Sequence, residues 1–298
     1  MNQKIDLSRL SSALLIPGDA QTAYRDPAAI YEAGVFHLYC TMVENLPGET
    51  QPYLRLAEFT SRNLLNWDGP HPLTPRDRNC NWSSPGSVVR NGREWILCLQ
   101  TYCRPNGEKY GNSNSRVFLM RSCNLADWSQ PELIRVHGKN VAREDMGRMI
   151  DPFLLKTDDG WWCFFKQNGV SYSFSKDMNE WEYKGSSAAG ENVCVLPYGT
   201  GYRMFSSPEN GIRIMDSNDL VHWTQRVPDL YLGQKDWPWT HGRLTAAFVM
   251  EAPDLPGLPR YLMFFHGSQF SEAEAFDSYA SIGLAWSEDL THWSWPQE

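Results

Sequence analysis

The chain of 298 residues has few of the features that mark membrane, secreted or nucleic-acid-binding proteins. Its N-terminal apolar patch, at 13–16, is too short for a signal peptide, and no apolar run approaches the length of a membrane span. Positive charge is in deficit, because the formal net charge is -8 and the pI is about 5.4. Such a protein repels nucleic acid and anionic membranes, so a neutral ligand is expected.

The cysteines also lack a pattern. They number seven, which is odd, and they form no CxxC pair and no regular spacing. Four of them, Cys40, Cys98, Cys163 and Cys194, fall inside apolar strand patterns, where a free thiol behaves as a small hydrophobic side chain. The pattern predicts reduced thiols and a cytoplasmic protein.

Motifs of several enzyme classes are missing. The sequence contains no P-loop, no nucleophile elbow and no HExxH. Gly199-Thr200-Gly201 is half of a dinucleotide fingerprint, but it lies in a hairpin pattern with no helix after it. Helical periodicity is nearly absent throughout, which favours an all-β fold.

One repeat consists of a polar residue followed by an apolar hairpin. Asp26-Pro27, Ser84-Pro85, Asp151-Pro152 and Glu191-Asn192 each precede an apolar strand, a tight turn and a second strand. A repeat of this kind indicates an architecture built from similar units.

A second repeat, Ser-x-Asn/Asp-Leu/Met-x-x-Trp, is more specific. Its side chains favour a turn that bonds to its own backbone, here between a third and a fourth strand, and its Leu or Met and its Trp are expected to pack between neighbouring sheets. The five copies are Ser61 to Trp67, Ser122 to Trp128, Ser175 to Trp181, Ser217 to Trp223 and Ser287 to Trp293.

The two repeats in phase define five units. The units span Tyr24 to Pro75, Trp82 to Val136, Arg148 to Gly190, Glu191 to Gly233, and Thr240 to the end. Each has the content of a four-stranded antiparallel propeller blade, so the sequence predicts an all-β, five-bladed β-propeller forming a single domain over 1–298. Little chain follows Trp293, and the segment from Ser12 to Ile16 is therefore predicted to supply the strand that closes the ring.

Candidate site residues follow from this geometry, because the inner strands of a propeller start at one rim and surround one pocket. The starting residues are Asp26, Ser84, Asp151, Glu191 and His241. Three carboxylates in one pocket repel and are costly to bury, which indicates function. Each Asp-Pro taken alone could instead be a turn device. The acids that compete with Glu191 are Glu144, Asp145, Glu182 and Glu209.

These motifs resemble those of the five-bladed propeller glycosidases, above all glycoside hydrolase family 43, over nearly the whole chain from Tyr24 onward. The resemblance implies that Asp26 is a general base, that Asp151 orients and tunes the acid, and that Glu191 is the general acid. The chain departs from the family after Glu191, where Asn192 and Val193 replace the usual small residue or proline.

Such roles are chemically reasonable for hydrolysis with inversion. One carboxylate deprotonates water and one protonated carboxyl group protonates the leaving oxygen, at a separation of roughly 6.5 to 9.5 Å. A third carboxylate near Glu191 is expected to raise the pKa of Glu191, while Asp26 stays ionised if it is better hydrogen-bonded.

Further residues near the unit starts are candidates for sugar binding. Arginines there could pair with the carboxylates or hold sugar hydroxyls, and tryptophans could stack on a sugar ring, although packing between blades is the alternative for the tryptophans. The candidates are Arg25, Trp82, Ser84, Arg148, Trp237, Trp239, His241 and Arg243. The resemblance implies a channel role for His241 beside a structural calcium ion, with a hydrogen-bonded core histidine as the alternative; His266 is interpreted as structural.

The sequence thus predicts a glycoside hydrolase that acts on an oligosaccharide, requires no cofactor and binds neither nucleic acid nor membrane. The reaction is expected to proceed by inversion and to release a terminal sugar of the arabinofuranose, xylose or galactose type. Three alternatives stay open: a related retaining or phosphorolytic propeller glycosidase, a catalytically silent sugar-binding propeller, and a protein-binding scaffold with an exposed apolar face.

Overall fold

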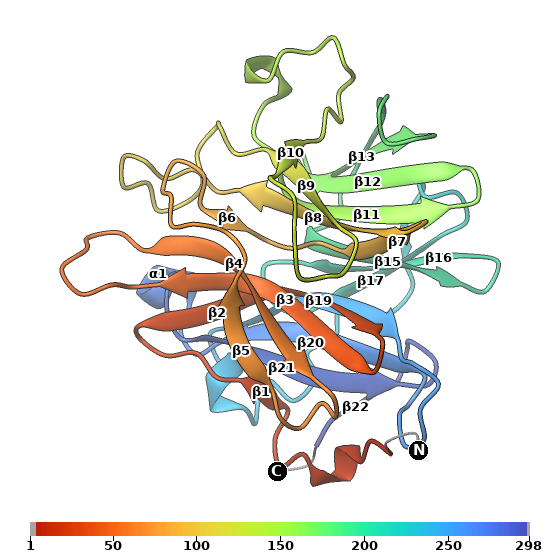
Figure 1. The fold of residues 1–298 in the computed structure, drawn as a ribbon. Coiled ribbons are helices and arrows are strands. Elements are labelled where there is room, and N and C mark those ends of the chain that lie inside the picture. Colours follow the sequence, from red (N-terminus) through yellow and green to blue (C-terminus); the bar gives the residue numbers. More distant parts are fainter. Residues whose placement is uncertain (1–3, 297–298) are drawn as a thin grey trace.

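The computed structural model describes residues 4–296 and consists of five antiparallel sheets (Figure 1). The first blade is β2 (Thr22–Glu32), β3 (Val35–Glu44), β4 (Tyr53–Ser61) and β5 (Asp68–Pro72). The second is β6 (Trp82–Ser83) with β7 (Val88–Asn91), then β8 (Glu94–Thr101), β9 (Val117–Ser122) and β10 (Glu132–Leu133). The third is β11 (Ile150–Thr157), β12 (Gly160–Lys166), β13 (Val170–Ser175) and β14 (Glu182–Ser187).

The remaining two blades follow the same order. The fourth is β15 (Glu191–Tyr198), β16 (Gly201–Ser207), β17 (Arg213–Ser217) and β18 (Thr224–Gln225). The fifth is β19 (Arg243–Glu251), β20 (Tyr261–Ser268) and β21 (Ala280–Ser287) with β22 (Trp293–Ser294). Neighbouring inner strands contact one another around the ring, and β19 returns to β2. The predicted five-bladed propeller is confirmed.

The ring closes through the N-terminal segment. The strand β1 (Leu14–Ile16) pairs antiparallel with β21, so the predicted closing strand is confirmed. The C-terminal β22 pairs with β21 as well. The strands β1 and β22 consequently both lie in the lower part of the view in Figure 1.

Helical elements in residues 4–296 are single turns. They are η1 (Leu7–Arg9), η2 (Glu144–Met146), η3 (Pro238–Thr240) and α1 (Glu272–Ala275). None of the helices in the described part of the chain has the length and apolar character needed to cross a membrane.

The Ser/Trp repeat forms the predicted turn. In the fourth blade the Ser217 hydroxyl accepts the Leu220 N–H (3.0 Å), the Asp219 carboxylate accepts the His222 N–H (2.8 Å), and the Trp223 indole donates to the Leu220 carbonyl (3.1 Å). The Leu or Met of every copy adopts a left-handed backbone conformation with φ between 62 and 66° at Leu64, Leu125, Met178, Leu220 and Leu290.

Each tryptophan of the repeat packs against the preceding blade. Ring contacts join Trp67 to Phe264, Trp128 to Tyr39, Trp223 to Phe164 and Trp293 to Phe205. Trp181 lies in a core cluster with residues of the second blade. Each contact removes apolar area from water and stabilises the junction by about 25 cal/mol per Å² buried. The repeat therefore holds adjacent blades together and fixes the positions of the inner strands.

Candidate active site

A bulge interrupts every inner strand near the start that faces the pocket. One residue of each bulge has a positive φ: Asp26 (52°), Ser84 (43°), Asp151 (51°), Asn192 (47°) and Ala246 (52°). The strand register shifts at four of these positions, and in the second blade the break separates β6 from β7. Bulges re-aim side chains and are common beside active sites. Five equivalent positions therefore surround one axis.

The predicted starting residues Asp26, Ser84 and Asp151 are the bulge residues of the first three blades, and the predicted Glu191 is the first residue of β15 in the fourth. The bulge residue of the fourth blade is Asn192, and Glu191 comes one position before it. The bulge residue of the fifth blade is Ala246, whereas His241 is an exposed residue at the end of η3 and does not line the pocket. Proline follows the bulge residue only in the first three blades, so the X-Pro signal missed the others.

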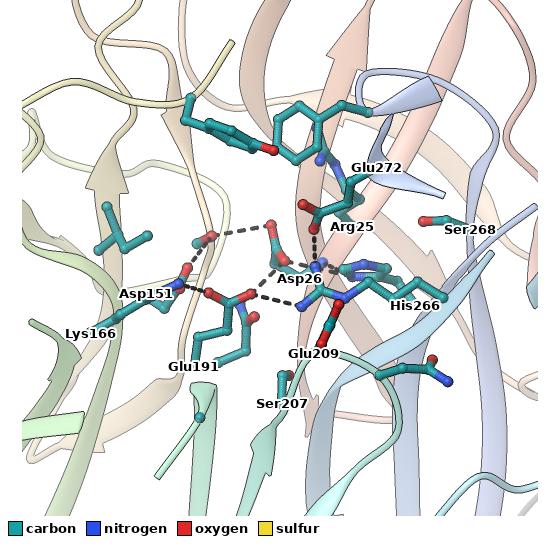
Figure 2. Close-up of a pocket in the computed structure, with 18 of the residues that line it drawn as sticks. Arg25, Asp26, Asp151, Lys166, Glu191, Ser207, Glu209, His266, Ser268 and Glu272 are labelled. Atoms are coloured by element: carbon teal, nitrogen blue, oxygen red, sulfur yellow. Dashed lines mark hydrogen bonds and ion pairs between the residues drawn. The ribbon is translucent and has the colours of Figure 1, made fainter. Parts of the chain in front are cut away.

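The bulges open into a cavity of about 1340 Å³ whose lining includes Asp26, Asp151 and Glu191. The side chains of these three residues point toward one another from three different blades (Figure 2). Glu209 and Glu272 line the same cavity on its fourth- and fifth-blade sides. The geometry on which the sequence prediction depended, namely convergence of distant carboxylates in one pocket, is therefore present.

Asp26 is the most extensively hydrogen-bonded of the three. Its carboxylate accepts from the Thr41 hydroxyl (2.9 Å), the Ser84 hydroxyl (3.1 Å) and the Asn192 amide (3.3 Å). Burial raises the pKa of Asp26, and the Arg25 charge and the two hydroxyl donors only partly oppose this rise. Asp26 is thus a carboxylate whose proton affinity is increased by its surroundings.

Asp151 shares the Ser84 hydroxyl with Asp26. The Ser84 oxygen lies 3.1 Å from Asp151 Oδ1 and 3.1 Å from Asp26 Oδ2. A hydroxyl has one proton to donate, so a proton on Asp151 would satisfy the second of these bonds. Burial first, and then the charges of Glu191 and Asp26, raise the pKa of Asp151 to about 7.

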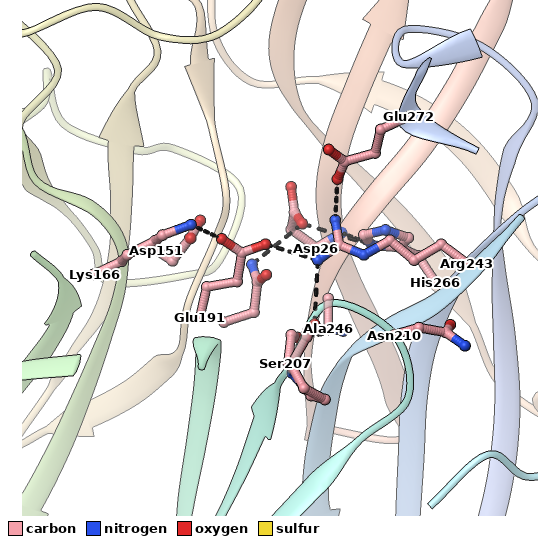
Figure 3. Close-up of polar contacts among 12 residues, drawn as sticks. Asp26, Asp151, Lys166, Glu191, Ser207, Asn210, Arg243, Ala246, His266 and Glu272 are labelled. Atoms are coloured by element: carbon pink, nitrogen blue, oxygen red, sulfur yellow. Dashed lines mark hydrogen bonds and ion pairs between the residues drawn. The ribbon is translucent and has the colours of Figure 1, made fainter. Parts of the chain in front are cut away.

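Glu191 has cationic partners. Lys166 contacts one carboxylate oxygen, and the Arg243 guanidinium donates to the other (2.8 Å) (Figure 3). Burial acts to raise the pKa of Glu191, but the Lys166 and Arg243 charges outweigh it and lower that pKa. This reverses the expectation that a nearby carboxylate would keep Glu191 protonated. In the free protein Asp151 holds a proton more readily than Glu191 does.

Contacts between the blades hold the bulges in place. At four junctions a side chain of one blade's second strand accepts the backbone N–H of the next blade's bulge residue. The pairs are Ser84 N–H with Thr41 Oγ1 (2.8 Å), Asp151 N–H with Gln100 Oε1 (2.5 Å), Ala246 N–H with Ser207 Oγ (2.8 Å), and Asp26 N–H with His266 Nδ1 (3.1 Å).

The fifth junction, between the third and fourth blades, is different. Thr41, Gln100, Ser207 and His266 each lie opposite the residue that precedes their own blade's bulge, and Lys166 occupies this position in the third blade, opposite Ile150. An ammonium group has three donors and no acceptor. Lys166 therefore bonds to the Glu191 carboxylate instead of to the N–H of Asn192.

His266 belongs to the site although the sequence interpretation took it as structural. It lines the cavity and is buried, and burial, with the Arg243 and Arg25 charges, lowers its pKa well below the usual value. A neutral imidazole with Nδ1 as the acceptor from Asp26 carries its proton on Nε2. His266 thus orients the backbone at Asp26. Its position in an alternating apolar strand gave no signal of this role.

Four of the predicted sugar-binding residues line the cavity: Arg25, Ser84, Arg148 and Arg243. The three predicted tryptophans do not. Trp82 packs edge-on against Phe118, with ring centroids 4.8 Å apart, and Trp237 stacks on Trp239 at 5.7 Å and on Phe265 at 5.9 Å. They fill space within and between blades, the alternative considered for them.

Two aromatic side chains at the cavity, Phe276 and Tyr110, come from loops between strands, outside the two sequence repeats. Phe276 lies over Arg25, with the guanidinium carbon 4.5 Å from the ring centroid, and Tyr110 meets Phe276 edge-on at 5.0 Å. Both line the cavity, and Tyr110 is 45% exposed. They form an accessible apolar surface beside polar groups, the combination that sugar rings bind. No sequence pattern distinguished them.

The calcium ion that the resemblance implies would need a set of ligands. Among the described residues, no group of three or more His, Cys, Asp or Glu side chains is placed to hold a metal ion. His241 lies outside the cavity, and Nδ1 of His266 already accepts the Asp26 N–H. The structural calcium ion stays a prediction, and no step of the chemistry is assigned to a metal.

No protein-family model and no curated protein matches the chain. Solved structures do. A family 117 glycoside hydrolase of the marine bacterium Zobellia galactanivorans is 14% identical, with a TM-score of 0.67 over 95% of this chain and 88% of that one. An alpha-L-arabinofuranosidase of Podospora anserina, in complex with cellotriose, is 10% identical, with a TM-score of 0.63 over 92% and 96%.

A glycosyl hydrolase from Bacteroides ovatus is also similar, with 11% identity and a TM-score of 0.67 over 97% of this chain and 95% of that one. At these identities the likeness shows the fold. The chain has the five-bladed propeller architecture found in these glycoside hydrolases.

Proposed function

We propose that this protein is a glycoside hydrolase that releases a terminal sugar from an oligosaccharide by inversion. The observation that carries the proposal is the convergence of Asp26, Asp151 and Glu191, from three blades, in one cavity with shared hydrogen bonds and shifted pKa values. Shifted acids in a cleft are typical of active sites. The propeller fold shared with glycoside hydrolases supports the same conclusion.

In the proposed reaction Asp26 is the general base. Its carboxylate is held by Thr41, Ser84 and Asn192, and its raised pKa brings its basicity closer to that needed to take a proton from water near neutral pH. Asp151, through the shared Ser84 hydroxyl, orients Asp26 and holds a proton near pH 7.

Glu191 is the proposed general acid. It must carry a proton to donate to the leaving oxygen, whereas in the free protein Lys166 and Arg243 favour its ionised form. Near neutral pH the form with Glu191 protonated is therefore a minor one in the free protein. The proposed enzyme works best on the acidic side of neutrality.

The terminal sugar in this proposal is of the arabinofuranose, xylose or galactose type. Arg148 lines the cavity, its Nε donates to the Gly111 carbonyl (2.8 Å), and it forms no ion pair within residues 4–296, so its two terminal nitrogens are available for sugar hydroxyls. Phe276 and Tyr110 offer faces for a sugar ring. No cofactor is required. A cytoplasmic location remains a prediction, and all seven cysteines are free thiols.

A screen of nitrophenyl glycosides tests the proposal. Wild-type protein is expected to hydrolyse at least one arabinofuranoside, xyloside or galactoside, and Asp26→Asn and Glu191→Gln are each expected to lose most of this activity. Failure of the wild type on every sugar, or activity that survives both substitutions, rules out the assignment.

The alternative of a catalytically silent sugar-binding propeller is favoured by one observation: two cations hold the proposed acid in its ionised form. The same screen of glycosides distinguishes a hydrolase from a silent sugar-binding protein. A silent binder shows saturable binding of a monosaccharide without turnover, and its binding changes little when Glu191 is replaced by Gln.

A further inference from the structure

Lys166 occupies a position that the other four blades use for a different purpose. There, Thr41, Gln100, Ser207 and His266 present an acceptor to the bulge N–H of the next blade. Lys166 has the same register position and presents a donor. A position that is structural at four junctions of the ring is thus chemically different at the fifth, and the difference falls beside the proposed acid.

We propose that Lys166 is a positioning residue that fixes the Glu191 side chain in the cavity and, by its charge, sets the upper pH limit of the proposed reaction. This inference rests on the proposed function for its catalytic consequence. Its structural part, the hold of Lys166 on Glu191, can be tested without any turnover.

The geometry supports a role for Lys166 that Arg243 cannot fill alone. Lys166 and Arg243 approach different oxygens of Glu191, so the carboxylate is held from the β12 side and from the β19 side. Arg243 also pairs with Glu272, and it therefore divides its charge between two carboxylates. The ammonium of Lys166 has Glu191 as its ion-pair partner among the described residues.

The charges around Glu191 have opposing effects. Lys166 and Arg243 favour its ionised form, while burial acts against that form. The carboxylates of Asp26 and Asp151 interact with Glu191 and disfavour its charge. Arg243, which contacts Glu191, also pairs with Glu272, and its charge lowers the pKa of His266, which is neutral. Removing Lys166 deletes one of two cations and leaves two acids, so the balance shifts toward protonation.

The sign of the kinetic effect follows. A general acid is active when protonated, so kcat/KM falls as the pH rises through the pKa of Glu191 in the free protein. Lys166 moves this alkaline limb to lower pH. A neutral residue in its place moves the limb to higher pH, whereas an arginine, which keeps the charge, retains it near the wild-type position.

The test uses the full chain with three substitutions. Lys166→Met removes the charge at similar length, and Lys166→Arg preserves it. Lys156→Met is the matched control, because Lys156 is an exposed residue of β11 whose ammonium lies against Asn91. The first measurement is a carbon-13 NMR titration of the glutamate carboxyl groups, with the Glu191 signal assigned by its loss in Glu191→Gln. Melting curves confirm that every variant is folded.

The Glu191 midpoint is expected to rise by at least half a pH unit in Lys166→Met and to stay within 0.2 units of wild type in the other two, on the order of magnitude of a single nearby charge. An unchanged midpoint in Lys166→Met overturns the inference.

The second measurement is the pH profile of kcat/KM on the best glycoside of the screen. The alkaline limb is expected to shift by the same amount as the Glu191 midpoint. If the midpoint rises and the limb does not move, the catalytic part of the inference is wrong. If no variant turns over any glycoside, the proposed function fails, while the titration still decides whether Lys166 controls Glu191.

Discussion

The junction between the third and fourth blades differs from the other four in what its side chains do. At the four, a neutral acceptor satisfies a backbone N–H of the next bulge, as Ser207 does for Ala246 at 2.8 Å. At the fifth, Lys166 pairs with Glu191, a side chain one position earlier. The repeated fold therefore separates two tasks: four junctions stabilise bulges, and one controls the ionisation of an acid.

This difference shows how a repeat can host chemistry without losing its architecture. All five bulges have the same backbone conformation, with φ between 43 and 52°, so the geometry does not depend on the residue that each carries. The first, second and third blades place Asp26, Ser84 and Asp151 there, whereas the fifth places Ala246. Function enters through side-chain identity at positions that the fold has already aligned.

The largest expected effect is the loss of kcat/KM in variants of the proposed acid, Glu191, and of the proposed base, Asp26. Glu191→Gln is expected to reduce kcat/KM about 10²- to 10⁴-fold on glycosides with poor leaving groups, and far less on dinitrophenyl glycosides, whose leaving oxygen needs no proton. Asp26→Asn is expected to lose activity on both, because every substrate needs an activated water. Steady-state kinetics on matched substrate pairs measure this. Equal losses for both variants on both leaving groups would contradict the assigned roles.

A second prediction concerns Asp151 and stability. The pKa of Asp151 is raised from 3.8 to about 7, so the folded protein binds this proton more tightly than the unfolded chain. Folding therefore becomes less favourable as the pH rises from about 4 to about 7. Asp151→Asn removes this cost and is expected to raise the free energy of unfolding above pH 7, by a few kcal/mol at most, with little change at pH 4.

Urea unfolding at pH 4, 6 and 8 measures this effect. Asp158→Asn, at an exposed turn of the same blade, serves as the control and should keep the wild-type pH dependence of stability. A variant at Asp151 that is less stable than wild type at pH 8 would show that the carboxylate is not the costly group described here.

A third prediction tests the structural junctions. Ser207→Ala leaves the N–H of the buried Ala246 without its acceptor, which is expected to cost about 1–3 kcal/mol of unfolding free energy. Ser186→Ala, at an exposed position of β14, is the control and should cost less than about 0.5 kcal/mol. Equal free energies of unfolding of the two variants would contradict the claim that Ser207 stabilises the bulge at Ala246.

The smallest expected effect is at His241. Because this side chain is exposed and lies outside the cavity, His241→Ala should change kcat/KM less than about twofold and should leave metal content unchanged. Kinetics and elemental analysis of the purified variant check this. A large loss of kcat/KM would show that His241 contributes to the active site.

The sequence predicted the fold well because both repeats have physical causes. The Ser/Trp turn needs side chains that bond their own backbone, and its Trp must meet the preceding sheet, so five copies specify five blades. The Asp-Pro and Ser-Pro pairs located three bulge residues, Asp26, Ser84 and Asp151, because proline follows each of them.

The rest of the site could not be predicted from the sequence, and the reasons are again physical. The bulge at Ala246 carries no polar side chain and no proline, so nothing in the chain distinguished it from an ordinary strand residue. The partners of Glu191, Lys166 and Arg243, come from other blades and are set by register. For the same reason the direction of the Glu191 pKa could not be deduced without coordinates.

The most direct test of the central claim is the anomeric configuration of the first product, followed by proton NMR during hydrolysis of the best glycoside by wild-type protein. If Asp26 activates water and Glu191 protonates the leaving oxygen, the sugar appears first in the anomer opposite to that of the substrate and then mutarotates. A first product with the substrate's own configuration would require a covalent intermediate and would contradict the roles assigned to both carboxylates.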